Sequence, residues 1–513
     1  MAATPSSSDE QIHPLKVLVD KQTNKVLFAE ADKDFVDVLL SFLTLPLGTI
    51  ARLVAKESNI EAVRVGSLSS LYESVAHLEE EHLCTPTCKE MLLQPRNSME
   101  AYCQQLRLNI DDTDPTKFFL CENLECNRKC KGLVSLFRNQ RCSCGKLMNT
   151  VLTPKNIILE KGFVKETATF IVSDDLYITP NVFGASVNLF QKLGIEYMET
   201  VEEQIVDITK KEVVDLLKFS LISETPMTDF VLKKELCLDN FIPINQYQFK
   251  TGEVPSDEGR KMVVKVQLRK SDGKIVFAEA NEDFANFLYS FLTFPLGGVL
   301  HMLKGSSSLS CIDKLYKSMT ELSSDRYLNS QELKEKLANP LCAPQFNLSN
   351  QILPIGAKEL PTYYFNSSKG HNLSLFTLPK SVSNYGERNA PLNIVDPRSP
   401  AGKSSDSQGF AKEPSMYMVT DDLVVTPMSS ISAVSYLNRL RVPLFDLEER
   451  VITIGVKEGL GILKASLTST SALTNGLKHL TKESDFCITL GDAFKGPSHI
   501  WDGFLGYLYS KRK

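Results

Sequence analysis

The sequence predicts an α+β fold in which one module, made of two β-hairpins and several helices, occurs twice in tandem. The first observation is an internal repeat: residues 16–48 and 265–297 align without a gap, and 18 of the 33 positions are identical. The second observation is that both copies continue in the same order, with a variable middle, a second pair of strands and two helices. Repetition of this strength indicates that one structural unit is present twice. Residues shared by the copies should then serve the fold, and residues unique to one copy are better candidates for function.

Each copy is expected to open with a hairpin. Residues 16–20 and 25–29 alternate between apolar and polar types, which is typical of strands with one buried face. In the second copy the turn contains Asp272-Gly273, a strong signal for a short hairpin.

A buried helix should follow each opening hairpin, with Asp32 and Asn281 at its N-cap. Its few polar residues recur at the same spacing in both copies and would form one narrow stripe on an otherwise apolar helix. These residues are Asp34, Asp37, Ser41 and Thr44 in the first copy, and Asp283, Asn286, Ser290 and Thr293 in the second. A helix with so little polar surface is expected to be packed on most sides.

The apolar run at residues 284–303 contains no charged side chain and is long enough to span a membrane. Its counterpart in the first copy carries Asp37 and Arg52, and Pro295 interrupts the run itself. We therefore expect a buried helix, a break and a second helix, with Pro46 and Pro295 in the first turn of that second helix.

The second hairpin of each copy is predicted at residues 170–180 and 417–427. Paired aspartates lie at its centre in both copies and are expected to form the turn. Each hairpin ends in Thr-Pro, which predicts the N-cap and first residue of a following helix. These dipeptides are Asp174-Asp175 with Thr179-Pro180, and Asp421-Asp422 with Thr426-Pro427. Residues 211–221 and 457–467 align as a further amphipathic helix.

These assignments predict the organisation of the whole chain. Stretches rich in Gly, Pro and Ser, and stretches without a counterpart in the other copy, mark the boundaries. The predicted parts are a disordered lead (1–14), a first module (15–239) with an insert at about 117–149, a linker (240–261), a second module (262–483) with a disordered loop at about 380–415, and an aromatic C-terminal tail (484–513).

The composition argues against several classes of function. The net charge of −5 and the pI near 5.9 argue against electrostatic attraction of the whole protein to nucleic acid or anionic membranes. Residues 1–14 lack the apolar core of a signal peptide, so we expect the cytoplasm or the nucleus. In such a reducing compartment the twelve cysteines are not expected to form a disulfide framework.

A cluster of cysteines in the first copy predicts one structural zinc site. Two short cysteine turns separated by a strand-length spacer can supply four thiolates in a tetrahedron, as in a zinc ribbon. The predicted ligands are Cys121, Cys126, Cys142 and Cys144. The spacing departs from the usual pair of C-x2-C turns, so Cys130 could replace Cys126, and thiols without metal remain the alternative. Cys84 and Cys88, upstream, are expected to be structural.

The same insert carries a local excess of positive charge. Six basic side chains face two acidic ones, and they are candidate binding residues: Arg128, Lys129, Lys131, Arg138, Arg141 and Lys146. Zinc ribbons bind proteins as readily as nucleic acids, so this patch makes nucleic-acid binding the second hypothesis.

Several strings in both copies resemble a plant family catalogued as domain of unknown function 674. They are Phe28–Ala31, Ser41–Gly48, Asp174–Pro180 and the segment from Cys121 to Asn149. The resemblance covers nearly the whole chain and implies a plant protein, but it brings no established activity.

A non-catalytic interaction or scaffold protein with one structural zinc is therefore the first hypothesis. None of the seven histidines recurs between the copies, and no nucleophile elbow, phosphate loop or zinc-protease helix is present in the sequence. The recurring aspartate pairs fit turns better than a catalytic dyad. We expect a protein partner rather than nucleic acid, a membrane or a small-molecule substrate.

Overall fold

The computed structural model describes residues 12–123, 132–154, 162–182, 184–195, 197–233, 260–356, 363–367, 373–377, 389–399 and 409–481. Internal contacts divide the chain into two compact units, Met1–Leu477 and Lys478–Lys513. Helix α18 (Lys478–Thr481) is the described part of the second unit. In the first unit, the first half denotes the described residues up to 233, and the second half denotes those from 260 onward.

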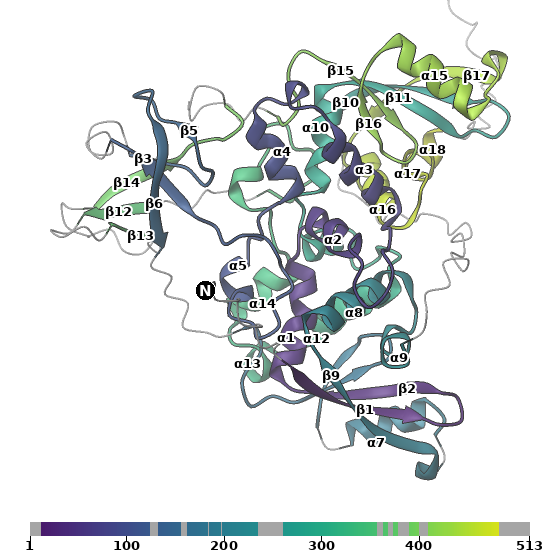
Figure 1. The fold of residues 1–513 in the computed structure, drawn as a ribbon. Helices are drawn as coiled ribbons and strands as arrows, with labels where there is room; N and C mark the ends of the chain where they lie inside the picture. Colours follow the sequence, from purple (N-terminus) through teal and green to yellow (C-terminus); the bar gives the residue numbers. More distant parts are fainter. Residues whose placement is uncertain are drawn as a thin grey trace, which may run out of the picture. The chain divides into compact units, whose positions relative to one another are not determined.

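Each half contains a five-stranded sheet, and the two sheets have the same strand order among the described strands (Figure 1). In the first half the order is β8-β7-β2-β1-β9, and in the second it is β16-β15-β11-β10-β17. The first sheet consists of β1 (His13–Asp20), β2 (Lys25–Ala31), β7 (Phe170–Ser173), β8 (Ile178–Pro180) and β9 (Val201–Ile208). The second consists of β10 (Met262–Arg269), β11 (Ile275–Asn281), β15 (Met416–Thr420), β16 (Val425–Pro427) and β17 (Leu447–Ile454). Both predicted hairpins of each copy are confirmed.

The helices also follow the same order in both halves. The first half has α1 (Lys33–Ser41), α2 (Leu47–Val54), α3 (Gly66–His77), α4 (Pro86–Leu93), α5 (Glu100–Cys103), α7 (Ala185–Lys192), α8 (Lys210–Ile222) and α9 (Pro226–Val231). The second half has α10 (Glu282–Phe291), α11 (Leu296–Met302), α12 (Ser310–Glu321), α13 (Ser324–Tyr327), α14 (Gln331–Ala338), α15 (Ser430–Leu440), α16 (Val456–Thr468) and α17 (Ala472–Gly476). Helices α8 and α16 contain the predicted segments 211–221 and 457–467.

The long apolar run of the second half is two short buried helices, α10 and α11, as predicted. Asp32 caps α1 by accepting a hydrogen bond from the Phe35 amide (3.2 Å), whereas Asn281 occupies the N-cap of α10 without such a bond. In the described part of the chain, we find no helix with the length and hydropathy needed to cross a membrane.

Two local predictions about proline were wrong. Pro46 and Pro295 lie one residue before their helices, in extended conformation, where their carbonyls still accept the first helical bonds. The Thr-Pro dipeptides lie in strands β8 and β16 rather than at helix starts, and α7 and α15 begin later. These two strands lie at sheet edges, where a proline without an N–H group does not interrupt a hydrogen-bond ladder.

Apart from Asp34 and Asp283, which are half-buried, the polar stripe that begins on α1 and α10 is buried and binds backbone. The Asp37 carboxylate accepts hydrogen bonds from the amides of Phe163 (2.8 Å) and Val164 (2.9 Å). At the equivalent position, Asn286 accepts bonds from Phe410 and Ala411 (2.7 Å each). The stripe thus fixes the segment that leads into the second hairpin of each half.

The two halves exchange a helix. Helix α3 of the first half packs against α16 and β16 of the second (Figure 1). Helix α12 of the second half packs against α8 and β8 of the first. Equivalent hydrogen bonds accompany both contacts: Ser67 Oγ donates to the Ser469 carbonyl (2.6 Å), and Cys311 Sγ donates to the Ser223 carbonyl (3.2 Å).

The halves cross at Pro46 and Pro295, which form an antiparallel bridge. The Leu47 amide donates to the Phe294 carbonyl (2.9 Å), and the Leu296 amide donates to the Leu45 carbonyl (3.0 Å). One continuous hydrophobic core includes buried residues from both halves. The predicted module boundaries stay a prediction, but these contacts argue against independent folding of each half.

A third sheet combines strands from both halves. The first half supplies β3 (Phe118–Cys121), β4 (Leu133–Val134), β5 (Gln140–Arg141) and β6 (Leu147–Pro154), and the second supplies β12 (Tyr363–Ser367), β13 (Leu373–Thr377) and β14 (Asn389–Ile394). The order is β3-β6-β13-β12-β14-β4, with β5 paired to β6. A bridge between Phe119 and Ser135 joins the two ends, so the sheet closes on itself.

This sheet differs from the prediction of a disordered loop at 380–415 in the part that the structure describes, residues 389–399 and 409–415, whereas 380–388 and 400–408 lie outside the described residues. The segment contains β14, whose Asn393 amide donates to the Gly132 carbonyl (2.7 Å). It also contributes the buried residues Val395, Arg398 and Phe410 to the interior. Composition alone missed these residues because several of their partners, such as Asn286 for Phe410 and Gly132 for Asn393, lie more than a hundred positions away. Most of the predicted linker and the predicted tail lie outside the described residues.

Candidate functional site

The cysteine turns of the first half lie on neighbouring strands of the third sheet. Strand β3 ends at Cys121, and β5 leads into Cys142. Strand β6 lies between them, because Met148 pairs with both Cys121 and Gln140. Sheet pairing therefore brings together cysteines that are about twenty positions apart in the sequence.

The second turn has the tight geometry expected of a metal-binding knuckle. The Gly145 amide donates to the Cys142 carbonyl (2.8 Å), and the Cys142 amide donates to the Lys146 carbonyl (2.9 Å). Gly145 has φ +83°, a left-handed conformation that favours glycine.

Three predicted ligands converge. The Sγ atoms of Cys121, Cys142 and Cys144 all lie within 4.8 Å of one another, and those of Cys121 and Cys144 are 3.5 Å apart. Sulfur atoms around a tetrahedral zinc are about 3.8 Å apart. None of the three is in a disulfide, and the Asn123 amide donates to Cys121 Sγ (3.4 Å). The described residues therefore offer three thiols that could hold a metal ion, while Cys126 and Cys130 lie outside them.

The surroundings of the thiols are apolar on one side and open on the other. Cys121 and Cys142 are buried in a cluster with Phe119, Met148 and Val395, the last from the second half. Burial raises the pKa of Cys121 to about 11; the neighbouring thiols act in the same direction and the Asn123 amide acts against them. Thiolates at this position need a compensating cation, so metal binding here would release protons.

The basic residues of the insert are only partly within the described residues. Arg138, Arg141 and Lys146 are exposed, and none forms an ion pair with a described acidic side chain. Arg141 and Lys146 flank the turn that holds Cys142 and Cys144. Arg128, Lys129 and Lys131 lie in the segment 124–131, outside the described residues.

The paired aspartates have structural roles. Asp174 accepts hydrogen bonds from the amide and the hydroxyl of Thr228 (2.7 Å each), and Asp421 accepts the same two bonds from Thr474 (2.7 and 2.9 Å). They lie in the predicted turns and join each second hairpin to the start of α9 or α17. Burial raises the pKa of both carboxyls, that of Asp421 to about 6.

The upstream cysteines lie in the packed interior. Cys84 Sγ donates to the Ala411 carbonyl (3.0 Å), and Cys88 is fully buried beside Thr85. Neither belongs to the group of cysteines that converge around Cys121.

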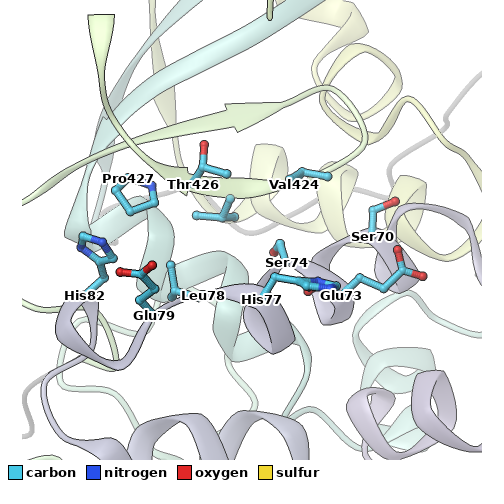
Figure 2. Close-up of a pocket in the computed structure, with 11 residues that line it drawn as sticks. Ser70, Glu73, Ser74, His77, Leu78, Glu79, His82, Val424, Thr426 and Pro427 are labelled. Carbon is cyan, nitrogen blue, oxygen red and sulfur yellow. The ribbon is translucent and has the colours of Figure 1, made fainter. Parts of the chain in front are cut away.

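A second candidate site is a groove between the halves, which we call the α3–β16 groove. It has a volume of about 460 Å³. One wall is a single face of α3, formed by Ser70, Glu73, Ser74 and His77. The opposite wall is formed by the consecutive residues Val424, Val425, Thr426 and Pro427 (Figure 2). Leu78, Glu79 and His82 continue the first wall beyond the helix end.

Sequence reasoning missed this groove. Its two walls are more than 340 positions apart and come from opposite copies, so no local motif joins them. The sequence does contain one signal for the groove, namely that the residues of α3 differ from those of α12. A comparison that looks for residues shared by the two copies does not reveal it.

The family model described as "Protein of unknown function (DUF674)" matches residues 9–457, which cover most of the chain. The chain belongs to this family. Searches of curated proteins and of solved structures each found no match. DUF674 membership therefore supports the resemblance seen in the repeated strings and assigns no activity.

Proposed function

We propose that this DUF674 protein is a non-catalytic interaction or scaffold protein whose recognition surface is held in place by one structural zinc ion. The observation that carries the proposal is the convergence of three cysteine Sγ atoms within 4.8 Å. The proposed ligands are Cys121, Cys142 and Cys144, with Cys126 or Cys130 as the fourth.

The zinc would stabilise a small part of the third sheet. It would tie the end of β3 to the turn between β5 and β6, where the ladder of β3 and β6 already has an irregularity between Leu120 and Cys121. Small structural zinc sites supply the folding energy that a short sheet with little core lacks.

The repeated framework supports a division of labour between the halves. We infer that the halves descend from one duplicated unit, because the aligned strings and the matching sheet orders coincide. The cysteines and the exposed basic side chains belong to the first copy. A rigid turn displays such side chains at little cost in conformational entropy, which favours recognition.

Metal analysis of protein purified under reducing, chelator-free conditions tests the zinc. We expect one zinc per chain, and its loss in Cys142→Ser. The matched control Cys84→Ser, which changes a thiol outside the cluster, should keep the metal. A stoichiometry near zero in the unmodified chain would refute the site.

Charge reversal tests the surface. Arg138→Glu with Arg141→Glu should weaken capture of a protein partner at unchanged thermal stability, because exposed charges contribute little to folding. If instead the unmodified chain binds nucleic acid, and the reversal flattens the salt dependence of that binding, the second hypothesis holds.

A further inference from the structure

The α3–β16 groove has an equivalent between the corresponding elements of the opposite halves. This α12–β8 groove, of about 410 Å³, lies between α12 of the second half and β8 of the first. Both grooves share a serine and a leucine on the helix side and a Thr-Pro dipeptide on the strand side. The pairs are Ser74 and Ser318, Leu78 and Leu322, Thr426 and Thr179, and Pro427 and Pro180. Differences between the grooves are therefore differences in side chains on one framework.

The α12–β8 groove is bridged by polar contacts. The Tyr177 hydroxyl donates a hydrogen bond to the Glu321 carboxylate at the end of α12. Beside it, Lys314 Nζ forms an ion pair with Asp175 Oδ2 at 2.6 Å. Helix and hairpin are thus joined directly across this groove.

The α3–β16 groove has neither contact. Val424 occupies the position of Tyr177, His77 that of Glu321, and Ser70 that of Lys314. Among the described residues, we find no side-chain hydrogen bond between this face of α3 and β16, and the buried Thr426 Oγ1 has no partner.

The shape of the groove fits an extended chain. Four consecutive residues line it, so it runs along β16, and β16 is an edge strand bonded to β15. An extended segment lying along β16 can place alternate side chains in the apolar and polar parts of the groove. Pro427 has no N–H to donate, so side-chain contacts and not a continuous backbone ladder would hold the segment. Val424, Val425 and Pro427 supply the apolar surface.

The charge of the groove selects a cationic side chain. Glu79 lies on the wall below Pro427 (Figure 2) and forms no ion pair with a described cation. Glu80 and Glu81 follow it, whereas the equivalent run in the other groove is Ser324 and Asp325 before Arg326. Glu73 is paired with Arg64 at 2.7 Å, and Lys89 donates to the Leu78 carbonyl (2.8 Å). Among the described residues, Glu79 is therefore the lining carboxylate without an ion pair; His82, which lies within 4.8 Å of it, pairs with Glu81 at 3.5 Å.

We propose that the α3–β16 groove binds an extended peptide segment of a partner protein, with apolar residues on β16 and a lysine or arginine side chain against Glu79. The α12–β8 groove, bridged by the Tyr177–Glu321 hydrogen bond and with Ser323 in the position of Glu79, does not. The groove shares no residue with the cysteine cluster, so this proposal and the zinc proposal can fail separately.

The test uses the full chain and a fluorescein-labelled heptapeptide of alternating valine and lysine, with a valine–glutamate heptapeptide as control. Fluorescence polarisation should show saturable binding of the lysine peptide and none of the glutamate peptide. The double variant Val424→Tyr with His77→Glu installs the bridge of the second groove. It should reduce affinity at least tenfold, although it adds a negative charge that would otherwise favour a cationic probe.

Two matched variants complete the design. Tyr177→Val with Glu321→His opens the second groove and should leave affinity at the first unchanged or add a second site. Glu79→Gln should weaken binding several-fold, whereas Glu90→Gln, which removes an exposed carboxylate outside the groove, should not. Thermal melting and circular dichroism establish that each variant is folded.

The proposal is wrong if the unmodified chain does not prefer the lysine peptide, or if the folded closing variant binds it as well as the unmodified chain does. It is also wrong if spermidine competes as effectively as the peptide, because the groove would then take a free amine.

Discussion

The cysteine-bearing strands β3–β6 and the strands β12–β14 occupy corresponding places in the two halves, but only the first set carries the converging cysteines. The first set ends in three converging thiols, and the corresponding strand of the second half, Tyr363–Ser367, has no cysteine. The two sets are joined by parallel pairing of β13 with β6 and of β14 with β4. The strands of the second half thus complete the sheet that contains the cysteine-bearing strands of the first half.

The largest expected effect is the loss of this strand pairing when the proposed metal is removed. Structural zinc in small modules contributes on the order of 10 kcal/mol to local folding. If the proposed zinc is present, chelation should therefore release β3 and β6, and with them β13 and β14, while the two five-stranded sheets stay folded. Hydrogen exchange followed by mass spectrometry measures this directly. Protection of β13 and β14 that survives chelation would show that the second set is stable without the first.

A smaller effect concerns the pH dependence of stability, which should differ between Asp37 and its counterpart Asn286. Burial raises the pKa of Asp37 to about 6, while Lys33 and two backbone amides act against it. Because this folded-state pKa lies above that of the unfolded chain, the stabilising contribution of Asp37 is full below about pH 4 and is lost as the pH rises through 6. Relative to Asp37→Asn, the unmodified chain should therefore lose about 3 kcal/mol of unfolding free energy between pH 4 and pH 7.

Denaturant unfolding of the two proteins at several pH values gives this difference. The reciprocal variant Asn286→Asp should acquire a pH dependence of the same sign in the second half. A pH-independent difference would mean that Asp37 titrates normally in the folded state.

The crossing of the halves predicts two equal, moderate effects. A Cβ atom at Gly48 would lie 2.9 Å from the Leu292 carbonyl oxygen, and one at Gly297 would lie 2.9 Å from the Leu43 carbonyl oxygen. Gly48→Ala and Gly297→Ala should each lower the free energy of unfolding by about 1–3 kcal/mol, the usual cost of overpacking. Thermal or denaturant unfolding checks this, and clearly unequal costs would show that the crossing is not symmetric in energy.

The smallest effect concerns the chain between the halves. A specific protease site introduced between residues 240 and 250 should allow cleavage without separation, because helices α3 and α12 are exchanged. Size-exclusion chromatography should find both fragments in one peak of unchanged volume. Fragments that separate under native conditions would support independently folded halves.

Much of the local structure was predictable from the sequence. Strand alternation gave both hairpins, Pro295 marked the break between α10 and α11, and the spacing of Asp37 and Ser41 indicated a buried stripe. Cys121, Cys142 and Cys144 were predicted to meet because zinc ligands in short turns carry a local signal. Whether they hold zinc stays a prediction.

The features that were not predicted depend on contacts with residues far away in the chain. Thr179-Pro180 and Thr426-Pro427 have the local chemistry of a helix start, but pairing with β7 and β15 makes them strands. The packing of α3 and α12 on the opposite half has no local signature, since α3 also packs against α2 and α4 of its own half and its apolar residues do not show which neighbour they contact. The groove lined by Glu79 and Thr426 was hidden for the same reason.

The exchange of helices also constrains how this protein can change. Each groove takes its helix from one copy and its strand from the other, so a gene product cut down to a single copy would contain both kinds of wall and no complete groove. A substitution on β16 of the second half alters the α3–β16 groove, whose helix belongs to the first half. A substitution on α12 of the second half alters the α12–β8 groove, whose strand belongs to the first half. Neither half can therefore change at these grooves without affecting a site that the other half also builds.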